Sequence, residues 1–130
     1  MTLQVALVIP ERELWAGRAE LVIAKTLDGD IGVLTDHAPV LGILFEGSLV
    51  QIRPSDPSEP DVFAAVSGGF FSVADNQVSI LARHAQLGMD VDTEATQSAL
   101  DKALEAADPA HPPEESPDVR YYRALLRAAG

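Results

Sequence analysis

Cysteine is absent from this chain and basic residues are scarce. Without cysteine, the protein can form no disulfide, thiolate nucleophile or cysteine zinc site, and its composition agrees with a reducing compartment. Only 9 lysines and arginines face 20 aspartates and glutamates, which gives a formal net charge of −11. Because such a charge repels nucleic acid phosphates and anionic lipid headgroups, we expect neither nucleic acid nor a bare membrane surface as a partner.

Long apolar runs are also missing. No stretch approaches the roughly 20 apolar residues that a membrane helix needs. The first residues carry neither the basic region nor the apolar run of a signal peptide. We therefore expect a soluble protein without a secretion signal.

The signatures of common active sites do not occur either. No glycine-rich turn ends in the Gly-Lys-Ser/Thr of a P-loop, and no serine lies in a nucleophile elbow. The acidic run 90–94 lacks the glycine of a calcium loop, since Ala95 occupies that position. His37, His84 and His111 have no metal-ligand spacing. We expect no metal, no cofactor and no catalysis by the chain on its own.

What the sequence does have is a β-type period over residues 3–85. Apolar and polar residues alternate in about nine short segments, spaced about 8–12 residues apart, which predicts an all-β sandwich or barrel. The segments are separated by turn signals such as Gly17, the proline-rich run 54–61 and Ser67-Gly68-Gly69. Hydrophobic residues make up 47% of the chain and aromatics 5%, so the core should be aliphatic. Trp15, beside Gly17, is expected to cover the sheet.

A helical period replaces the β period at Gly88. Asp92 is expected to begin a helix with an alanine stripe, and the proline-rich connection 108–117 ends it. Asp118 is expected to cap a second, short helix, with an apolar face at Val119, Tyr122, Leu126 and Ala129 and a basic stripe at Arg120, Arg123 and Arg127. We divide the chain into a β domain, residues 1–87, and a helical hairpin, residues 88–130. Because the hairpin has modest apolar content, we expect its docking to be weak or dependent on a partner.

The segment 28–41, Asp-Gly-Asp-Ile-Gly-Val-Leu-Thr-Asp-His-Ala-Pro-Val-Leu, organises the β domain. A buried strand ends in a polar corner at residues 35–39, and a second apolar run follows almost at once. Pro39 removes a backbone donor and keeps Ala38 out of helical geometry. The corner is therefore a rigid loop that presents a carboxylate and an imidazole.

This segment closely resembles the signature of the epsilon subunit of bacterial F-type ATP synthase. That signature reads roughly Gly-Glu-hydrophobic-Gly-hydrophobic-hydrophobic-Pro-Gly-His-Ala-Pro. Two further stretches match in the same order, one from Ile9-Pro10-Glu11 to Gly17 and one from Ser67-Gly68-Gly69-Phe70 to Val78-Ser79-Ile80-Leu81-Ala82. The resemblance implies a mainly β N-terminal sandwich of about ten short strands, followed by a C-terminal α-helical hairpin.

The resemblance also implies a role. The chain would be a non-catalytic rotor subunit of the central stalk, which binds the gamma subunit and the c-ring and couples ring rotation to ATP synthesis. It would lie at the cytoplasmic face of the bacterial cell membrane, held there only through the complex. By position, contacts to the c-ring would fall on Asp30 and His37, and contacts to gamma on Leu41 and Gly42.

Two further family properties concern the hairpin. Members commonly extend the second helix to inhibit ATP hydrolysis at the catalytic head, and Arg120, Arg123 and Arg127 have the charge for that contact. The alternative is a solvated stripe, or pairing with acids of the first helix. Some members bind ATP through an Ile/Leu-Asp-x-x-Arg-Ala pattern, of which only Asp92 is present here. Ala95 replaces the arginine, so we expect weak or absent ATP binding.

Two other functions stay open on the residues alone. A β-sandwich module for a small ligand or peptide would have a concave polar pocket and no need for gamma. A small hydrolase would use His37 with the neighbouring Asp36 as an acid–base pair.

Overall fold

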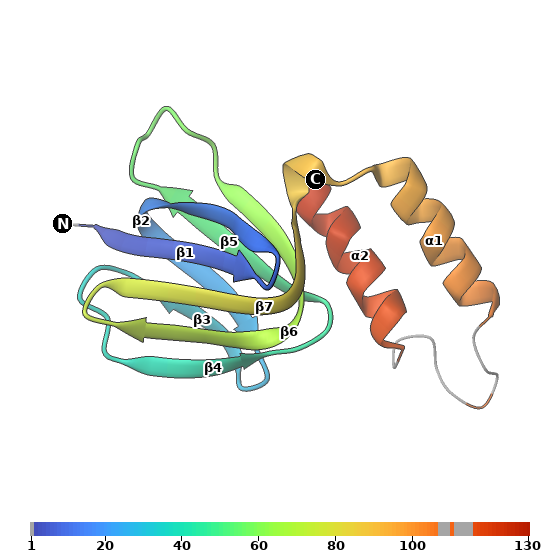
Figure 1. Cartoon of the computed structure of the whole chain (residues 1–130), viewed down its shortest axis with the longest axis horizontal. Helices are drawn as coiled ribbons and strands as arrows, with labels where there is room; N and C mark the ends of the chain where they lie inside the picture. Colours follow the sequence, from blue (N-terminus) through green and yellow to red (C-terminus); the bar gives the residue numbers. More distant parts are fainter. Residues whose placement is uncertain (1, 107–109, 111–115) are drawn as a thin grey trace.

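The computed structural model describes residues 2–106, residue 110 and residues 116–130. In this part of the chain a β-sandwich is followed by a 3-10 turn and two helices (Figure 1). The elements are β1 (Leu3–Ile9), β2 (Arg12–Thr26), β3 (Gly29–Val33), β4 (Val40–Leu44), β5 (Ser48–Pro54), β6 (Val62–Ala74), β7 (Gln77–Leu87), η1 (Gly88–Asp90), α1 (Thr93–Glu105) and α2 (Pro117–Ala129). Most of the proline-rich connection predicted at 108–117, with His111, lies outside the described residues.

The sandwich predicted from the sequence is confirmed, but its strand count is corrected. The described residues form seven strands rather than about ten short ones, because β2, β6 and β7 run continuously for 15, 13 and 11 residues. Gly17 and the Gly68-Gly69 pair, expected to separate strands, lie inside β2 and β6. A glycine within a strand often marks a bend rather than an end.

The long strands join the two layers. The first half of β2 pairs with β1, and its second half pairs with β3 and β5. Likewise, β6 pairs first with β5 and then with β4, while β7 pairs with both β6 and β1. One layer therefore contains β4, β6, β7, β1 and the start of β2, and the other contains β3, the end of β2, β5 and the start of β6.

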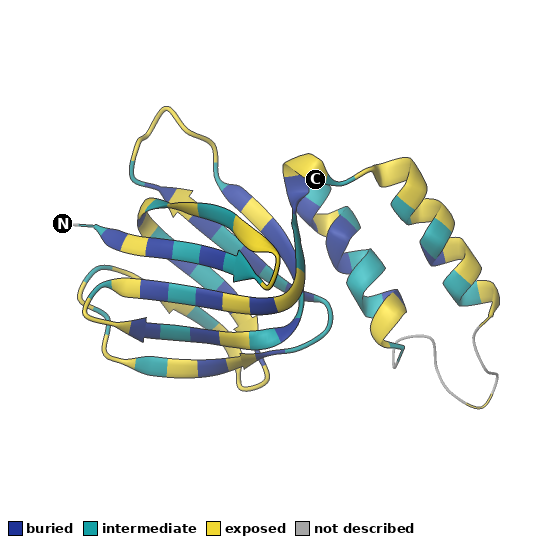
Figure 2. Ribbon diagram, in the orientation of Figure 1, coloured by how far each residue is buried: buried dark blue, intermediate teal, exposed yellow. Residues whose placement is uncertain are grey.

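The core between the layers is aliphatic, as predicted. Buried and exposed residues alternate along the strands (Figure 2), and Phe71 is the largest side chain that is fully buried. The prediction for Trp15 is confirmed, because its ring packs against this core and covers Gly17. A Cβ at Gly17 would lie 3.2 Å from the ring, so glycine leaves the space that the indole occupies.

The two helices lie at the end of the sandwich away from the N-terminus (Figure 1). Asp92 is the N-cap of α1, as predicted, and its side chain accepts a hydrogen bond from the backbone N–H of Ala95. The cap predicted for α2 is wrong. Ser116 caps this helix, with Pro117 at its first turn, and Asp118 lies inside it.

The buried face of α2 also differs from the prediction. Val119 is buried as expected, but the other buried positions are Ala124, Leu125 and Ala128 rather than Tyr122, Leu126 and Ala129. These residues pack on Ala65 of β6, so α2 docks on the sandwich within the single chain. α1 packs against α2 and has one buried residue, Leu100. How firmly the hairpin is held stays a prediction.

Candidate partner-binding surfaces

The loop at residues 34–39 is built as a tight turn. The backbone N–H of His37 donates to the carbonyl of Leu34 at 3.2 Å, and Asp36, at the third position of the turn, has a φ of 67°. That left-handed geometry is uncommon for a residue with a side chain. The loop is therefore held in a conformation that its sequence does not favour by itself.

His37 and Asp36 do not form an acid–base pair. The Nδ1 atom of His37 lies 2.7 Å from the carbonyl oxygen of Ala38. The carboxylate of Asp36 accepts a hydrogen bond from the side-chain amide of Asn76 at 3.0 Å. Because each side chain has a separate partner, the geometry does not support the hydrolase alternative.

Asp30 lies near the start of β3 and His37 lies after its end, so the two residues are not brought together. Asp30 is the second residue of the strand, exposed and in register with Lys25 of β2. The preceding turn is fixed by the buried Thr26, whose hydroxyl donates to the carbonyl of Gly29 and accepts from the N–H of Asp28. His37 follows the other end of the strand, so the two residues are separate points of contact.

Leu41 and Gly42 on β4 have opposite surroundings. The side chain of Leu41 is 69% exposed, whereas Gly42 is buried. A Cβ at Gly42 would lie 2.8 Å from Cγ2 of Thr26, so this glycine lets β4 approach the end of β2. Of the two residues, only Leu41 presents a side chain to a partner.

An exposed apolar row crosses the outer surface of the layer that contains β4, β6 and β7, and Leu41 is its only member among the residues predicted from the sequence. Ile43 is in register with Phe70, and Phe70 with Leu81, so the three side chains share a face of the sheet with Leu41. Ile43 is 57% and Phe70 45% exposed. Beside the row lies a depression of about 320 Å³, lined by Val8, Ile9, Pro10, Gly69, Phe70, Leu81, Ala82 and Arg83. We call Leu41, Ile43, Phe70 and Leu81 the apolar row.

A signal for this row was present in the sequence. Apolar residues occupy both faces at 40–45 and at 70–73, and a strand that is apolar on both faces needs cover on both. The packed layer covers one face, and the described chain leaves the other in solvent.

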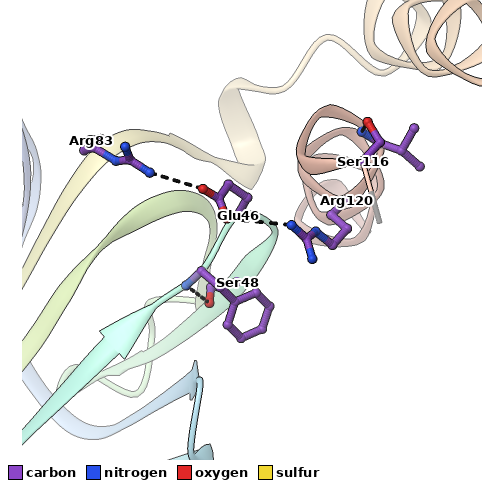
Figure 3. A network of polar contacts seen from close by, with 7 residues as sticks. Glu46, Ser48, Arg83, Ser116 and Arg120 are labelled. Atoms are coloured by element: carbon purple, nitrogen blue, oxygen red, sulfur yellow. Dashed lines mark hydrogen bonds and ion pairs between the residues drawn. The ribbon is translucent and has the colours of Figure 1, made fainter. Parts of the chain in front are cut away.

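The basic stripe of α2 faces the sandwich. Glu46, in the β4–β5 turn, lies between two arginines (Figure 3): its carboxylate is 3.2 Å from Arg83 of β7 and 3.8 Å from Arg120 of α2. Arg123 and Arg127 join Arg120 in lining a pocket of about 240 Å³ with Phe45, Glu46 and Gly47. The Nε of Arg120 is buried and has no hydrogen-bond partner among the residues that the structure describes. Arg120 thus links the hairpin to the β domain.

Other binding sites are sparse in the part of the chain that the structure describes. No cluster of three or more histidine, cysteine or acidic side chains there could hold a metal ion. No helix among these residues is long and apolar enough to span a membrane. Asp92, the remnant of the nucleotide pattern, is occupied in capping α1.

Comparisons with known proteins place the chain in a family. Residues 2–88 match the family model described as ATP synthase, Delta/Epsilon chain, beta-sandwich domain. The ATP synthase epsilon chain of Streptomyces coelicolor is 47% identical over 125 residues, which cover 96% of this chain and 97% of the relative. The chain belongs to the ATP synthase epsilon-chain family. The epsilon chain of Thermobifida fusca is 49% identical over 100 residues, 76% of this chain and 72% of that protein.

Solved structures agree with this assignment at the level of the fold. A chain in the structure of the Euglena gracilis mitochondrial ATP synthase, titled OSCP/F1/c-ring, matches with a TM-score of 0.78 at 20% identity and covers 99% of this chain and 82% of that one. A chain of the Tetrahymena thermophila mitochondrial ATP synthase, titled central stalk/cring, matches with a TM-score of 0.63 at 18% identity. It covers 100% of this chain and 98% of the neighbour.

The family predicted from the segment 28–41 is therefore confirmed. The epsilon chain is a subunit of ATP synthase and does not itself catalyse the reaction. Because the chain belongs to this family, an ATP synthase subunit explains its fold better than an unrelated ligand-binding module does.

Proposed function

We propose that this epsilon-family chain is a rotor subunit of the central stalk in a proton-translocating ATP synthase, where it couples c-ring rotation to ATP synthesis. It works at the cytoplasmic face of the bacterial cell membrane and is held there by its partners. Identity with epsilon chains of bacteria supports this proposal, as do neighbours whose titles name a central stalk and a c-ring.

One observation carries the proposal of a docking surface for gamma. The apolar row is exposed on a chain with a net charge of −11, and it lies on strands held in register by a closed ladder of pairings. Contiguous apolar surface on a rigid sheet is typical of a protein–protein interface. Leu41 belongs to this surface. Gly42 is buried and presents no side chain to a partner, but it lets β4 approach Thr26 at the end of β2.

Phe70 at the centre of the row provides the test. Phe70→Asp should weaken binding to the gamma subunit by roughly 100-fold or more, because a central aromatic anchor is replaced by a charge that must be desolvated. Phe63→Asp is the matched control, since Phe63 lies on the same strand, is 37% exposed and is in register with Gln51 outside the row. Titration calorimetry with purified gamma measures both variants, and circular dichroism checks that both fold. Equal affinities for the two variants would refute the row as the gamma surface.

Asp30 and His37 are proposed as contacts to the polar loops of the c-ring. A carboxylate and an imidazole suit basic and amide partners, and both residues lie outside the apolar row. Since the structure separates them, each is tested alone in the assembled enzyme. Asp30→Ala and His37→Ala should each lower ATP-driven proton pumping per ATP hydrolysed, while Glu13→Ala, which removes another exposed acid, should not. Full pumping efficiency in both single variants would contradict the assignment.

The basic stripe of α2 is proposed as a contact to the catalytic head that restrains ATP hydrolysis. Arg127 is exposed and Arg123 half-buried, whereas Arg120 already lies beside Glu46. Removal of the chain after Asp92 should raise ATP hydrolysis by the assembled enzyme, and replacing all three arginines by glutamine should have the same effect. Unchanged hydrolysis in both variants would leave the stripe only its contact with the β domain.

A further inference from the structure

Three segments far apart in the sequence meet at the end of the sandwich away from the helices (Figure 1). They are the loop 34–39, the turn between β6 and β7, and the start of β1. The turn consists of Asp75 and Asn76, with φ values of 52° and 61°, between the paired residues Ala74 and Gln77. Two positive φ values in a two-residue hairpin loop are the pattern of a type I′ turn, which fits the twist of the flanking strands.

Asn76 binds both of the other segments. Its Oδ1 accepts a hydrogen bond from the backbone N–H of Asp36 at 2.6 Å, and its Nδ2 donates to Oδ1 of Asp36 at 3.0 Å. Its backbone carbonyl accepts from the N–H of Gln4 at 2.8 Å. A side chain that both donates to and accepts from one residue fixes the position and the orientation of that residue.

Asp36, the residue that Asn76 binds, has a backbone conformation that its surroundings must stabilise. Asp36 stands at the third position of the Leu34–His37 turn with a left-handed backbone, where the signature that the segment resembles has glycine. A residue with a Cβ pays a cost for that conformation, and it persists only where the surroundings hold it. The two hydrogen bonds from Asn76 supply such a restraint from 40 residues away in the sequence.

We propose that Asn76 is a positioning residue for rotor coupling, which fixes the loop 34–39 through Asp36 so that His37 meets its partner in one geometry. The inference rests on the proposed function of His37 as a contact to the c-ring. Asn76 itself need not touch the ring. Because the restraint comes from the rigid β6–β7 hairpin, force on the loop is transmitted to the sheet rather than absorbed by the turn.

Asn76→Gly tests the proposal, because glycine keeps the positive φ of the turn and removes only the side chain. Asp75→Gly is the matched control, since it makes the same change at the neighbouring turn position and leaves both hydrogen bonds to Asp36 intact. Asp36→Asn is the conservative variant, because its side-chain oxygen still accepts from Asn76 and it tolerates a left-handed backbone. The readouts are amide hydrogen exchange of Asp36 in the full chain by NMR, and proton pumping by the ATP synthase assembled with each variant.

In Asn76→Gly, the amide of Asp36 should exchange roughly tenfold faster, as the loss of a hydrogen bond predicts. Pumping efficiency should fall toward that of His37→Ala. Asp75→Gly and Asp36→Asn should leave both readouts close to the parent chain. A merely structural role for Asn76 would lower the thermal stability of the chain without changing the exchange of Asp36 relative to its neighbours.

Two results would overturn the inference. The first is unchanged exchange of Asp36 in Asn76→Gly, which would mean that Asn76 does not hold the loop. The second is faster exchange with full pumping, in an assay where His37→Ala lowers pumping. If His37→Ala itself leaves pumping intact, the contact of the loop with the ring is refuted, and the exchange measurement still decides whether Asn76 fixes the loop.

Discussion

Gly88 lies where the β domain meets the hairpin, and replacing it by alanine should release α2 from the sandwich. A Cβ at this position would lie 2.0 Å from the carbonyl oxygen of Ala128, at the C-terminal end of α2. Gly88 is not among the glycines with positive φ, so alanine is compatible with its backbone. The substitution therefore acts on the contact between the two parts and leaves the local conformation of the chain unstrained.

The free-energy cost of Gly88→Ala follows from the distance between the added Cβ and the carbonyl oxygen of Ala128. Ordinary van der Waals contact begins near 3.4 Å, so the end of α2 must retreat by about 1.4 Å (3.4 − 2.0). Overpacking of this kind costs about 1–3 kcal/mol, which corresponds to roughly a 5- to 150-fold shift of the docking equilibrium. Among the described residues, no helical residue belongs to the core of the sandwich, so the stability of the sandwich itself should change little.

Hydrogen exchange measured by mass spectrometry reports on α2 and on the sandwich separately. An undocked helix of 13 residues is marginal in water, so peptides from α2 should lose protection in Gly88→Ala while peptides from β6 and β7 keep it. Gly32→Ala is the matched control, because no atom of the described residues lies within 4 Å of a Cβ at that position. Full protection of α2 in Gly88→Ala, or equal loss in β6 and β7, would refute the view that the hairpin is a separately docked part.

Three further predictions concern single side chains. Ser48→Ala should lower the free energy of unfolding in urea by about 1–3 kcal/mol, because the buried hydroxyl bonds two backbone groups; a change below about 0.5 kcal/mol would contradict this role. Burial raises the pKa of the Tyr121 hydroxyl, so its contribution to stability is complete below about pH 10 and is lost as the pH rises through its folded-state pKa. Tyr121→Phe should flatten the alkaline part of the stability profile, and an identical profile would refute the assignment. The hydroxyl of Ser58, and then its backbone N–H, hold the pKa of Asp56 below its usual range; Ser58→Ala should raise that pKa in an NMR titration, and an unchanged value would contradict the hydrogen bond.

The sequence predicted the type of each part well and the ends of its elements less well. Alternation of apolar residues is a local property, and it correctly indicated a sandwich followed by helices. Gly17 and Gly68-Gly69 predict strand ends, because glycine interrupts a local pattern. Whether the chain turns back or continues depends on pairing with distant strands, which the pattern does not contain.

The two errors in α2 have different origins. Serine followed by proline is a helix start with the cap at serine, and Ser116-Pro117 has that form. A cap at Asp118 would begin the helix two residues too late, and the correct cap can be read from the sequence. The apolar face is a separate matter, because it depends on which side of α2 packs on Ala65 of β6, and the local sequence does not contain that contact.

For the candidate surfaces too, local features could be predicted from the sequence, whereas features that depend on distant residues could not. The rigid corner around Pro39 was visible in the sequence, because proline and turn chemistry act locally. The partner of Asp36 was not visible, since Asn76 is 40 residues away and nothing local connects them. For the apolar row, the residues at 40–45 and 70–73 signal a second apolar face, but its members follow only from the register that aligns Ile43, Phe70 and Leu81 across three strands.

The measurement that tests the central claim most directly is size-exclusion chromatography, with light scattering, of this chain mixed with its cognate gamma subunit. A rotor subunit should elute with gamma as a stable one-to-one complex, and Phe70→Asp should abolish that complex while Phe63→Asp preserves it. Separate elution of the two folded proteins would contradict the account and would leave the β-sandwich without its proposed place in the central stalk.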